Sequence, residues 1–202
     1  MIEAALPSDI RAMLSDTVMA AARAAYASPG RHYHTWAHIE ACLREASSLR
    51  FDDPLAVYAA LLFHDAIYVA GSKDNEAQSA RLAAASLRGH ALFDAARSAR
   101  VEHLILLTAS HGALPADAPD DEKRLIDIDL SILAAPPAVY QRYAQDVRLE
   151  WVPEVVPATQ YAQGRAAFLR GVLAAPRIFH SAEFTVREGA ARTNIAQELA
   201  AL

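Results

Sequence analysis

The sequence predicts an all-α protein, a bundle of about eight or nine helices. Hydrophobic residues make up 53% of the 202 positions and glycine only 7 of them, so the chain can bury a sizeable core. Alanine, the strongest helix former, is frequent, whereas runs of Val, Ile and Thr are short. Apolar residues also recur at helical spacing between turn signals, a pattern typical of amphipathic helices.

Four helices are expected in the N-terminal half of the chain, and their ends carry recognisable signals. Pro29 and Gly30 end the first helix, and the segment 31–38 opens the second. Pro54, preceded by two aspartates, starts the third, and Gly89 ends the fourth. These helices span about residues 10–27, 31–49, 54–65 and 74–87.

Five more helices are expected in the C-terminal half. Pro136 and Pro137 separate the sixth helix from the seventh, because proline cannot continue a helix. Pro153 and Pro157 break the chain again before the last two helices. These five helices span about residues 92–110, 122–133, 138–151, 159–173 and 186–199.

We expect a single domain over residues 1–202, with a core of residues 31–135 on which the C-terminal helices of residues 137–202 pack. The net charge of −5 and the lack of a basic block argue against nucleic-acid binding as the main task. The single cysteine excludes an internal disulfide framework and is typical of a reducing compartment. Because no run has the pattern of a signal peptide or the length of a membrane span, we expect a soluble, cytoplasmic protein. A homodimer formed through the alanine-rich helix faces remains open.

An imidazole and a carboxylate stand side by side at the end of the third expected helix, as His64 and Asp65. From Pro54 onward this helix has no polar face, and such a helix is normally buried. A buried carboxylate is costly unless it is paired, hydrogen-bonded or bound to a metal. A metal ion is the simplest partner, so we predict that His64 and Asp65 are metal ligands.

The sixth expected helix carries two aspartates on opposite faces. Asp129 shares its face with Leu125 and Ile132, and no Lys or Arg of this helix points with it. Asp127 points to the other side, beside Lys123. We predict that Asp129 faces the core as a metal ligand and that Asp127 is a solvated acid. Hydrogen bonding of Asp129 to backbone amides is the alternative.

Three histidines are further candidates for the same site. His38 and His34 are four residues apart, a spacing that puts two imidazoles on one helical face. We predict His38 as a ligand, and His34 either as a ligand or as a group that binds substrate or supports the ligands. His111 ends the fifth helix and could face the same cavity, although histidines at helix ends often only interact with the helix dipole.

The order His38, His64-Asp65, Asp129 resembles that of the HD superfamily of metal-dependent phosphohydrolases. Other features resemble an uncharacterised bacterial branch of this superfamily and extend over about residues 31–200. They are Tyr33-His34-x-x-x-His38, Phe63-His64-Asp65-x-x-Tyr68, Asp74-Asn75-Glu76-x-x-Ser79-Ala80, Asp127-x-Asp129-Leu130-x-Ile132-Leu133, Gly164-Arg165 and Ala191-Arg192-x-Asn194. The resemblance implies an HD-type helical bundle with a divalent metal ion at the four ligands.

Two imidazoles and two carboxylates form a mixed nitrogen and oxygen set. Such a set suits Mn, Fe, Co, Ni or Zn better than Mg or Ca, which prefer oxygen alone. Four ligands on an octahedral ion leave positions for a water molecule and a phosphate oxygen. The resemblance therefore implies hydrolysis of a phosphoester or phosphoanhydride bond in a small phosphorylated molecule, with nucleotides among the candidates.

The reaction also needs a general acid or base, for which Asp65, Asp74 and Glu76 are candidates. Asp74 and Glu76 can instead cap the fourth helix and interact with its dipole. Deoxynucleotide monophosphatases of the superfamily carry a Glu one turn after the His-Asp pair, where this chain has Tyr68. The resemblance therefore implies neither their mechanism nor their substrate.

Four basic residues are candidates for binding the phosphate, namely Lys73, Arg81, Arg165 and Arg192. Arginine is suited to this task because its guanidinium group binds phosphate through two parallel hydrogen bonds. Arg165 and Arg192 could instead pair with structural acids such as Glu188 or Glu198.

Two other functions are compatible with the sequence. An HD-type di-iron oxygenase would need histidine ligands for a second ion, which His34 and His111 could supply. A non-catalytic metal or nucleotide sensor would bind its ligand without turnover.

Overall fold

The computed structural model of the chain describes residues 8–13, 17–110 and 114–202. Within these ranges it contains eleven α-helices, nine of them of seven or more residues, and no β-strand, so the all-α prediction is confirmed. The elements are α1 (Ser8–Met13), α2 (Thr17–Tyr26), α3 (Trp36–Ala46), α4 (Pro54–Phe63), α5 (Asn75–Leu87), α6 (Ala95–Leu107), η2 (Thr108–Ser110), α7 (Asp120–Asp129), η3 (Leu130–Ala134), α8 (Pro137–Trp151), α9 (Ala158–Ala174), α10 (Ala182–Thr185) and α11 (Glu188–Ala201).

Several helix ends follow directly from local side chains. The carboxylate of Asp53 accepts a hydrogen bond from the Ala56 amide at the start of α4, just before the proline in its first turn. Gly30 and Gly89 have φ angles of +83° and +78°, a left-handed conformation that glycine adopts without steric cost. The sequence signals at these positions therefore act through ordinary capping and turn chemistry.

Some boundaries differ from those expected from the sequence. Helix α3 begins at Trp36, so the segment that contains His34 precedes the helix instead of forming its first turn. Helix α7 ends at Asp129 and continues as the 3₁₀ helix η3. This tighter turn carries the chain away from the α-helical path just after Asp129.

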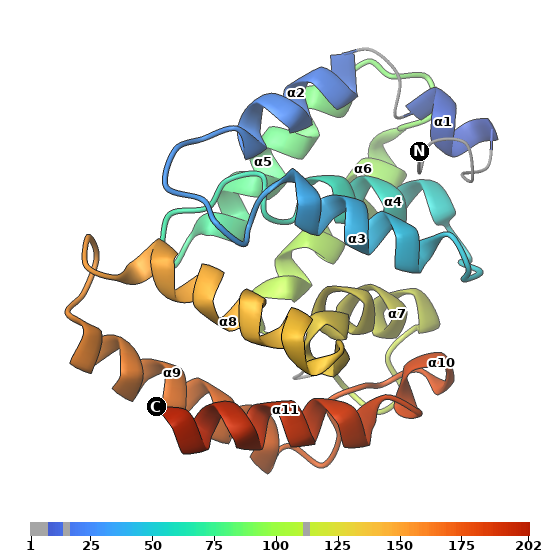
Figure 1. Cartoon of the computed structure of the whole chain (residues 1–202). Helices are drawn as coiled ribbons and strands as arrows, with labels where there is room; N and C mark the ends of the chain where they lie inside the picture. The colour runs from blue at the N-terminus through green and yellow to red at the C-terminus, as the bar shows by residue number, and fades with distance from the viewer. Residues whose placement is uncertain (1–7, 14–16, 111–113) are drawn as a thin grey trace.

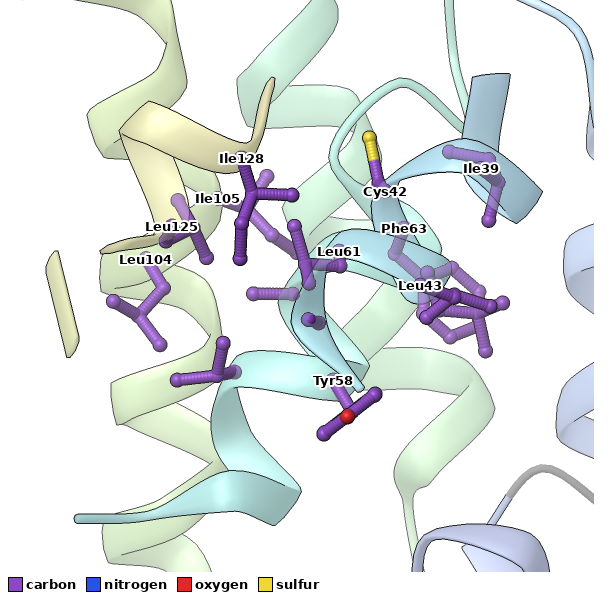
Figure 2. Close-up of a cluster of buried hydrophobic side chains, with 14 of the residues drawn as sticks. Ile39, Cys42, Leu43, Tyr58, Leu61, Phe63, Leu104, Ile105, Leu125 and Ile128 are labelled. Carbon is purple, nitrogen blue, oxygen red and sulfur yellow. The ribbon is translucent and has the colours of Figure 1, made fainter. Parts of the chain in front are cut away.

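Helix α4 forms the centre of the core and packs against α3, α5 and α6 (Figure 1). Every side chain from Ala56 to Phe63 is buried, as its all-round apolar sequence predicts. Figure 2 shows Leu61 and Phe63 among apolar side chains of α3, α6 and α7. Truncation of the fully buried Phe63 to alanine would cost about 3–5 kcal/mol.

The C-terminal helices α8, α9 and α11 lie together below this core (Figure 1). One side chain of α11 joins these helices to the turn that follows Asp129, and another joins them to one another. Asn194 donates hydrogen bonds to the carbonyls of Leu133 and Ala135, at the end of η3. Glu198 accepts hydrogen bonds from Arg165 of α9 and Tyr140 of α8. These contacts fix the C-terminal helices to the turn that follows Asp129.

The expectation that Asp127 is a solvated acid is wrong, because its side chain is fully buried. Its carboxylate accepts hydrogen bonds from the amides of His180 and Ser181 and from the Ser181 hydroxyl, at 2.8, 2.6 and 2.6 Å. Burial nevertheless raises the pKa of Asp127 above its ordinary value. The polar face of α7 is covered by a segment about 50 residues further along the chain, which the pattern of one helix cannot reveal.

None of the helices in the described part of the chain is long and apolar enough to cross a membrane.

Candidate metal centre

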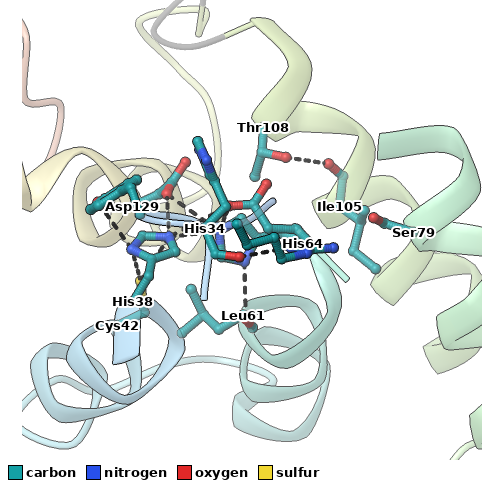
Figure 3. Close-up of polar contacts among 12 residues, drawn as sticks. His34, His38, Cys42, Leu61, His64, Ser79, Ile105, Thr108 and Asp129 are labelled. Atoms are coloured by element: carbon teal, nitrogen blue, oxygen red, sulfur yellow. Dashed lines mark hydrogen bonds and ion pairs between the residues drawn. The ribbon is translucent and has the colours of Figure 1, made fainter. Parts of the chain in front are cut away.

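The four predicted ligands converge from three elements of the bundle. His38 lies in the first turn of α3, His64 and Asp65 directly follow α4, and Asp129 is the last residue of α7. Nε2 of His38 lies 3.2 Å from Oδ1 of Asp129, and Nε2 of His64 lies 3.3 Å from the same oxygen. Oδ2 of Asp65 is 3.6 Å from the His38 nitrogen and 3.3 Å from the His64 nitrogen, while the two nitrogens are 3.2 Å apart. Figure 3 shows His38, His64 and Asp129 pointing toward one another.

These separations match the spacing of ligands around one transition-metal ion. With metal–ligand bonds of about 2.1 Å, neighbouring ligand atoms lie about 3.0 Å apart in an octahedron and about 3.4 Å apart in a tetrahedron. The distances in the structure, 3.2–3.6 Å, lie a little above the octahedral value and around the tetrahedral one, as expected of groups that could draw together on one ion. His38, His64 and Asp129 can therefore hold a single divalent ion, and Asp65 lies within 3.6 Å of both imidazole nitrogens.

The cluster is closed on its imidazole side and more open on its carboxylate side. The side chains of His38 and His64 are 4% and 2% exposed, whereas those of Asp65 and Asp129 are 17% and 11% exposed. Water or substrate would therefore approach past the two carboxylates.

Hydrogen bonds hold both imidazoles in an orientation suited to a metal ligand. Nδ1 of His64 lies 2.9 Å from the Leu61 carbonyl, an acceptor only, so it carries the proton and leaves the Nε2 lone pair free. Nδ1 of His38 lies 3.1 Å from the Tyr33 hydroxyl, which can accept its proton in the same way. Both Nε2 atoms face the carboxylates.

The charges of the cluster compensate one another. Burial alone would lower the pKa of His64, but Asp65 and Asp129 raise it well above its ordinary value. Burial alone would raise the pKa of each carboxyl group, but the adjacent His64 holds the pKa of both Asp65 and Asp129 below the ordinary value. The two carboxylates thus favour a positive charge between them, which a metal ion supplies.

Cys42 is an additional group that the sequence analysis did not consider as a ligand. His38, Cys42, His64 and Asp129 each offer one ligand atom, these atoms lie within 4.8 Å of one another, and the group can hold a metal ion. Sγ of Cys42 is 3.8 and 3.7 Å from the two ring nitrogens of His38, so it lies beside the ring. Burial, followed by the nearby Asp129 and Asp65, raises the pKa of this thiol. Cys42 is therefore a further candidate ligand beside the two imidazoles and Asp129.

Arg31 fixes the backbone on both sides of the cluster. Its guanidinium donates hydrogen bonds to the carbonyls of His34, Asp65 and Ala66, at 2.8, 2.7 and 2.7 Å. The same group lies over the rings of Tyr26 and Tyr68. Arg31 thereby ties the segment before α3 to the turn that carries the His-Asp pair.

His34 lies beside the ligand set and is oriented by Glu150 of α8. Its Nδ1 is 2.6 Å from Oε2 of Glu150, and its ring stacks on Tyr68 with the centroids 3.9 Å apart. The other oxygen of Glu150 accepts the amides of His32, Tyr33 and His34. The His34 side chain is 18% exposed, and within the described residues its Nε2 has no hydrogen-bond partner. This nitrogen is therefore available to a substrate.

The predicted acids of α5 are placed away from the four ligands. Asp74 is exposed, and its carboxylate accepts hydrogen bonds from Ser72 and Gln78. Glu76 is half-buried, and no contact in the described residues joins it to the cluster. Their neighbour Asn75 instead pairs with both backbone groups of Val69, which holds the loop after the His-Asp pair. This part of the motif therefore supports the loop that follows His64 and Asp65.

The predicted phosphate-binding residues are also engaged elsewhere or lie at the surface. Arg165 pairs with Glu198 at 2.7 Å, and Arg192 pairs with Glu188 at 2.7 Å, the alternative that the sequence left open. Lys73 is exposed, in the loop between the His-Asp pair and α5. His111 lies outside the described residues.

A cavity of about 840 Å³ opens onto the cluster between α3 and α8. His38, Cys42 and Asp129 form its inner wall. Its volume is within the range of small-molecule sites. The cavity gives a ligand of the metal centre room on the side of His38 and Asp129.

Two supporting residues had no recognisable signal in the sequence. Arg31 acts through backbone carbonyls about 34 residues away, and Glu150 acts through groups about 117 residues away. Cys42 did have one, because it follows His38 by four residues on the same helical face.

Comparisons with known proteins add no family to this description. No family model matches the chain, and none of the curated proteins matches it. An all-helical bundle with a cluster of His, Cys and Asp side chains that can hold a metal ion is compatible with an HD-type domain.

Proposed function

We propose that the protein is a divalent-metal-dependent phosphohydrolase of the HD type, which cleaves a phosphoester or phosphoanhydride bond in a small molecule. The observation that carries the proposal is the spacing of His38, His64, Asp65 and Asp129, which suits one ion. The more exposed carboxylate side leaves an approach for water and a phosphate oxygen. The order of these residues along the chain, which resembles the HD superfamily, supports the same reaction.

A bound divalent ion would lower the pKa of a water molecule and neutralise charge on the phosphoryl group. The mixed nitrogen and oxygen ligands favour Mn, Fe, Co, Ni or Zn, with Mg a weaker fit. In the proposed reaction the water oxygen forms a bond to phosphorus, and the bond between phosphorus and the leaving oxygen breaks. In this proposal Asp65, the more exposed of the two carboxylates, accepts the proton of the attacking water.

His34 is the group best placed to protonate the leaving oxygen. The carboxylate of Glu150 at 2.6 Å holds the Nδ1 proton of its ring and directs Nε2 away from Glu150. A histidine oriented by a buried carboxylate is the arrangement that hydrolases use for proton transfer. In this proposal His34 is the general acid and Glu150 positions it.

The decisive test is phosphate release from a panel of phosphomonoesters and nucleotides. Protein would be loaded separately with Mn, Co, Ni, Zn and Mg, and its metal content measured by elemental analysis. We expect turnover of some panel members with at least one metal, and loss of both metal and turnover in Asp65→Asn. Metal-loaded protein that releases no phosphate from any compound would refute the hydrolase and favour a sensor.

No observation favours the oxygenase. Within the described residues, one group of three or more His, Cys, Asp or Glu side chains is close enough to share an ion. His34, which would have to serve a second ion, is instead bonded to Glu150.

A further inference from the structure

The cavity beside the metal centre is a groove whose two long walls are α3 and α8 and whose floor is the turn after Asp129. Helix α3 contributes two parallel rows of side chains to it, because residues four and then three apart lie on one line of a helix. One row begins with the ligand His38 and continues through Cys42 to Glu45. The groove therefore starts at the metal centre and follows α3 toward its C-terminal end.

The middle of the groove is lined by small apolar side chains. They are Ala37, Ala41, Ala134, Ala135, Ala138 and Val139. Five of these six side chains are methyl groups, so the walls stay flat and leave the space between them open. The part of a ligand that packs on these side chains would be apolar and compact, because they offer it no polar partner.

The second row of α3 ends on a positive charge. Ala37, Ala41 and Arg44 lie on one line, and Arg44 follows His38 by six residues. At 1.5 Å per residue, Arg44 lies about 9 Å further along the helix axis than the metal ligand. Its side chain is exposed and lines the groove.

Arg44 differs from the other arginines of the groove in having no partner. Arg187 forms an ion pair with Glu45 at 2.9 Å, and Arg142 forms one with Asp146 at 2.9 Å. Among the described residues, none forms a hydrogen bond or an ion pair with the side chain of Arg44, and its backbone carbonyl accepts a hydrogen bond from Ser47. In a chain with a net charge of −5, this end of the groove thus carries one uncompensated positive charge.

We propose that the substrate carries a second anionic group, a phosphate or a carboxylate, which binds Arg44 while its scissile phosphate lies at the metal centre. A compact apolar body joins the two groups and lies over Ala41. This inference rests on the proposed phosphohydrolase function, because the metal centre must take the first phosphate.

Matched phosphonates test the second anion separately from the first. Inorganic phosphate, alkyl monophosphonates and α,ω-alkane bisphosphonates of the same chain lengths would be titrated into Mn-loaded protein by calorimetry. We expect one bisphosphonate of the series, whose length matches the separation of the metal centre and Arg44, to bind about threefold to fivefold tighter than its monophosphonate, as for an exposed ion pair. The gain should vanish in Arg44→Gln, whereas the affinity for inorganic phosphate should not change.

Two further variants complete the test. Arg170→Gln removes an exposed arginine of α9 outside the groove and should keep the full gain. Ala41→Phe fills the middle of the groove and should weaken both phosphonates but not inorganic phosphate. A gain that survives in Arg44→Gln, or no gain at any spacer length, overturns the Arg44 site and leaves the hydrolase intact. Failure of Mn-loaded protein to bind inorganic phosphate overturns the hydrolase itself, and this inference with it.

Discussion

Asp127 and Asp129 show how far two carboxylates on one helix can differ. Both are shielded from solvent, but Asp127 is satisfied by amides and a hydroxyl, whereas Asp129 faces two imidazoles. Neutral donors satisfy a buried carboxylate without a cation. The first residue therefore stabilises the fold, and the second lies among groups that can hold an ion.

The pair provides a matched test of this division. Asp129→Asn should abolish retention of the metal, because it removes a charged ligand. Asp127→Asn should keep the metal but lower the free energy of unfolding by about 1–3 kcal/mol, because its amide group would face backbone N–H donors. Elemental analysis and urea denaturation measure the two effects, and equal metal content in both variants would contradict the ligand assignment.

His34 should reveal its role through the leaving group of the substrate. Loss of a general acid slows release of a poor leaving group, such as an alkoxide, more than release of nitrophenolate. We expect His34→Gln to lower kcat for alkyl phosphates by about 10²–10⁴-fold and for p-nitrophenyl phosphate much less. An equal loss for both substrates, with normal metal content, would show that His34 only supports the structure.

The sequence is sufficient to predict the residues of the cluster but not the residues that hold them in place. His64 and Asp65 stand out because they interrupt an apolar helix, and Asp129 because it lies on an apolar face. Glu150 stands in an ordinary amphipathic helix, and its importance arises only from contacts with a distant loop. The environment of Asp127 was missed for the same reason, because residues from a later segment cover it.

At the scale of elements, the segment before α3 is held by contacts from two distant residues. Arg31 binds the carbonyls of the turn after α4, and Glu150 of α8 binds three successive amides of the segment. This segment has no helical hydrogen bonds of its own to fix it. The positions of His34 and His38 therefore depend on where α4 and α8 lie.

Glu150 should make this attachment sensitive to acid. Burial alone would raise its pKa, but the bonds from His34 and the amides lower the pKa below the ordinary value of 4.5. Because folding lowers this pKa, the charged carboxylate stabilises the protein above about pH 4.5, and the contribution is lost as the pH falls through the folded value. Glu150→Gln should cost about 1–3 kcal/mol at neutral pH and less at about pH 4.

Urea denaturation at the two pH values measures this difference. The exposed Glu154, four residues further along, provides the control, and Glu154→Gln should change stability little at either pH. A cost of Glu150→Gln that is the same at both pH values would contradict the account.

Helix existence could be predicted from the sequence better than helix geometry. Periodic apolar residues and proline or glycine signals place nearly every helix, because these effects are local. The change to the 3₁₀ helix η3 after Asp129 was not predicted, since it depends on Asn194 of α11, which binds the carbonyls of Leu133 and Ala135.

At the scale of the whole molecule, the ligands come from α3, the turn after α4 and the end of α7, so the site exists only when the core is assembled. An ion that binds the folded chain and not the unfolded one stabilises the fold by mass action. The cluster therefore links metal binding to global stability.

This linkage should invert the pH dependence of stability. In metal-free protein the pKa of His64 lies well above its ordinary value of 6.5, so its protonated form stabilises the fold at low pH. This contribution is lost as the pH rises through the folded pKa, which leaves Asp65 and Asp129 uncompensated. Metal-free protein should therefore lose stability above about pH 6.5, whereas metal-loaded protein should not. Thermal unfolding across this range tests the prediction, and parallel curves for the two forms would contradict it.

The chain has one cysteine, which is 2% exposed and lies against the ring of His38. Although Cys42 also lines the cavity beside the metal centre, so little of it is exposed that its reaction with a thiol reagent should be slow. Cations that bind the metal centre should slow the reaction of the Cys42 thiol with the reagent in proportion to their occupancy. The reactivity of the Cys42 thiol can thus report metal binding in the protein without a substitution or an attached dye.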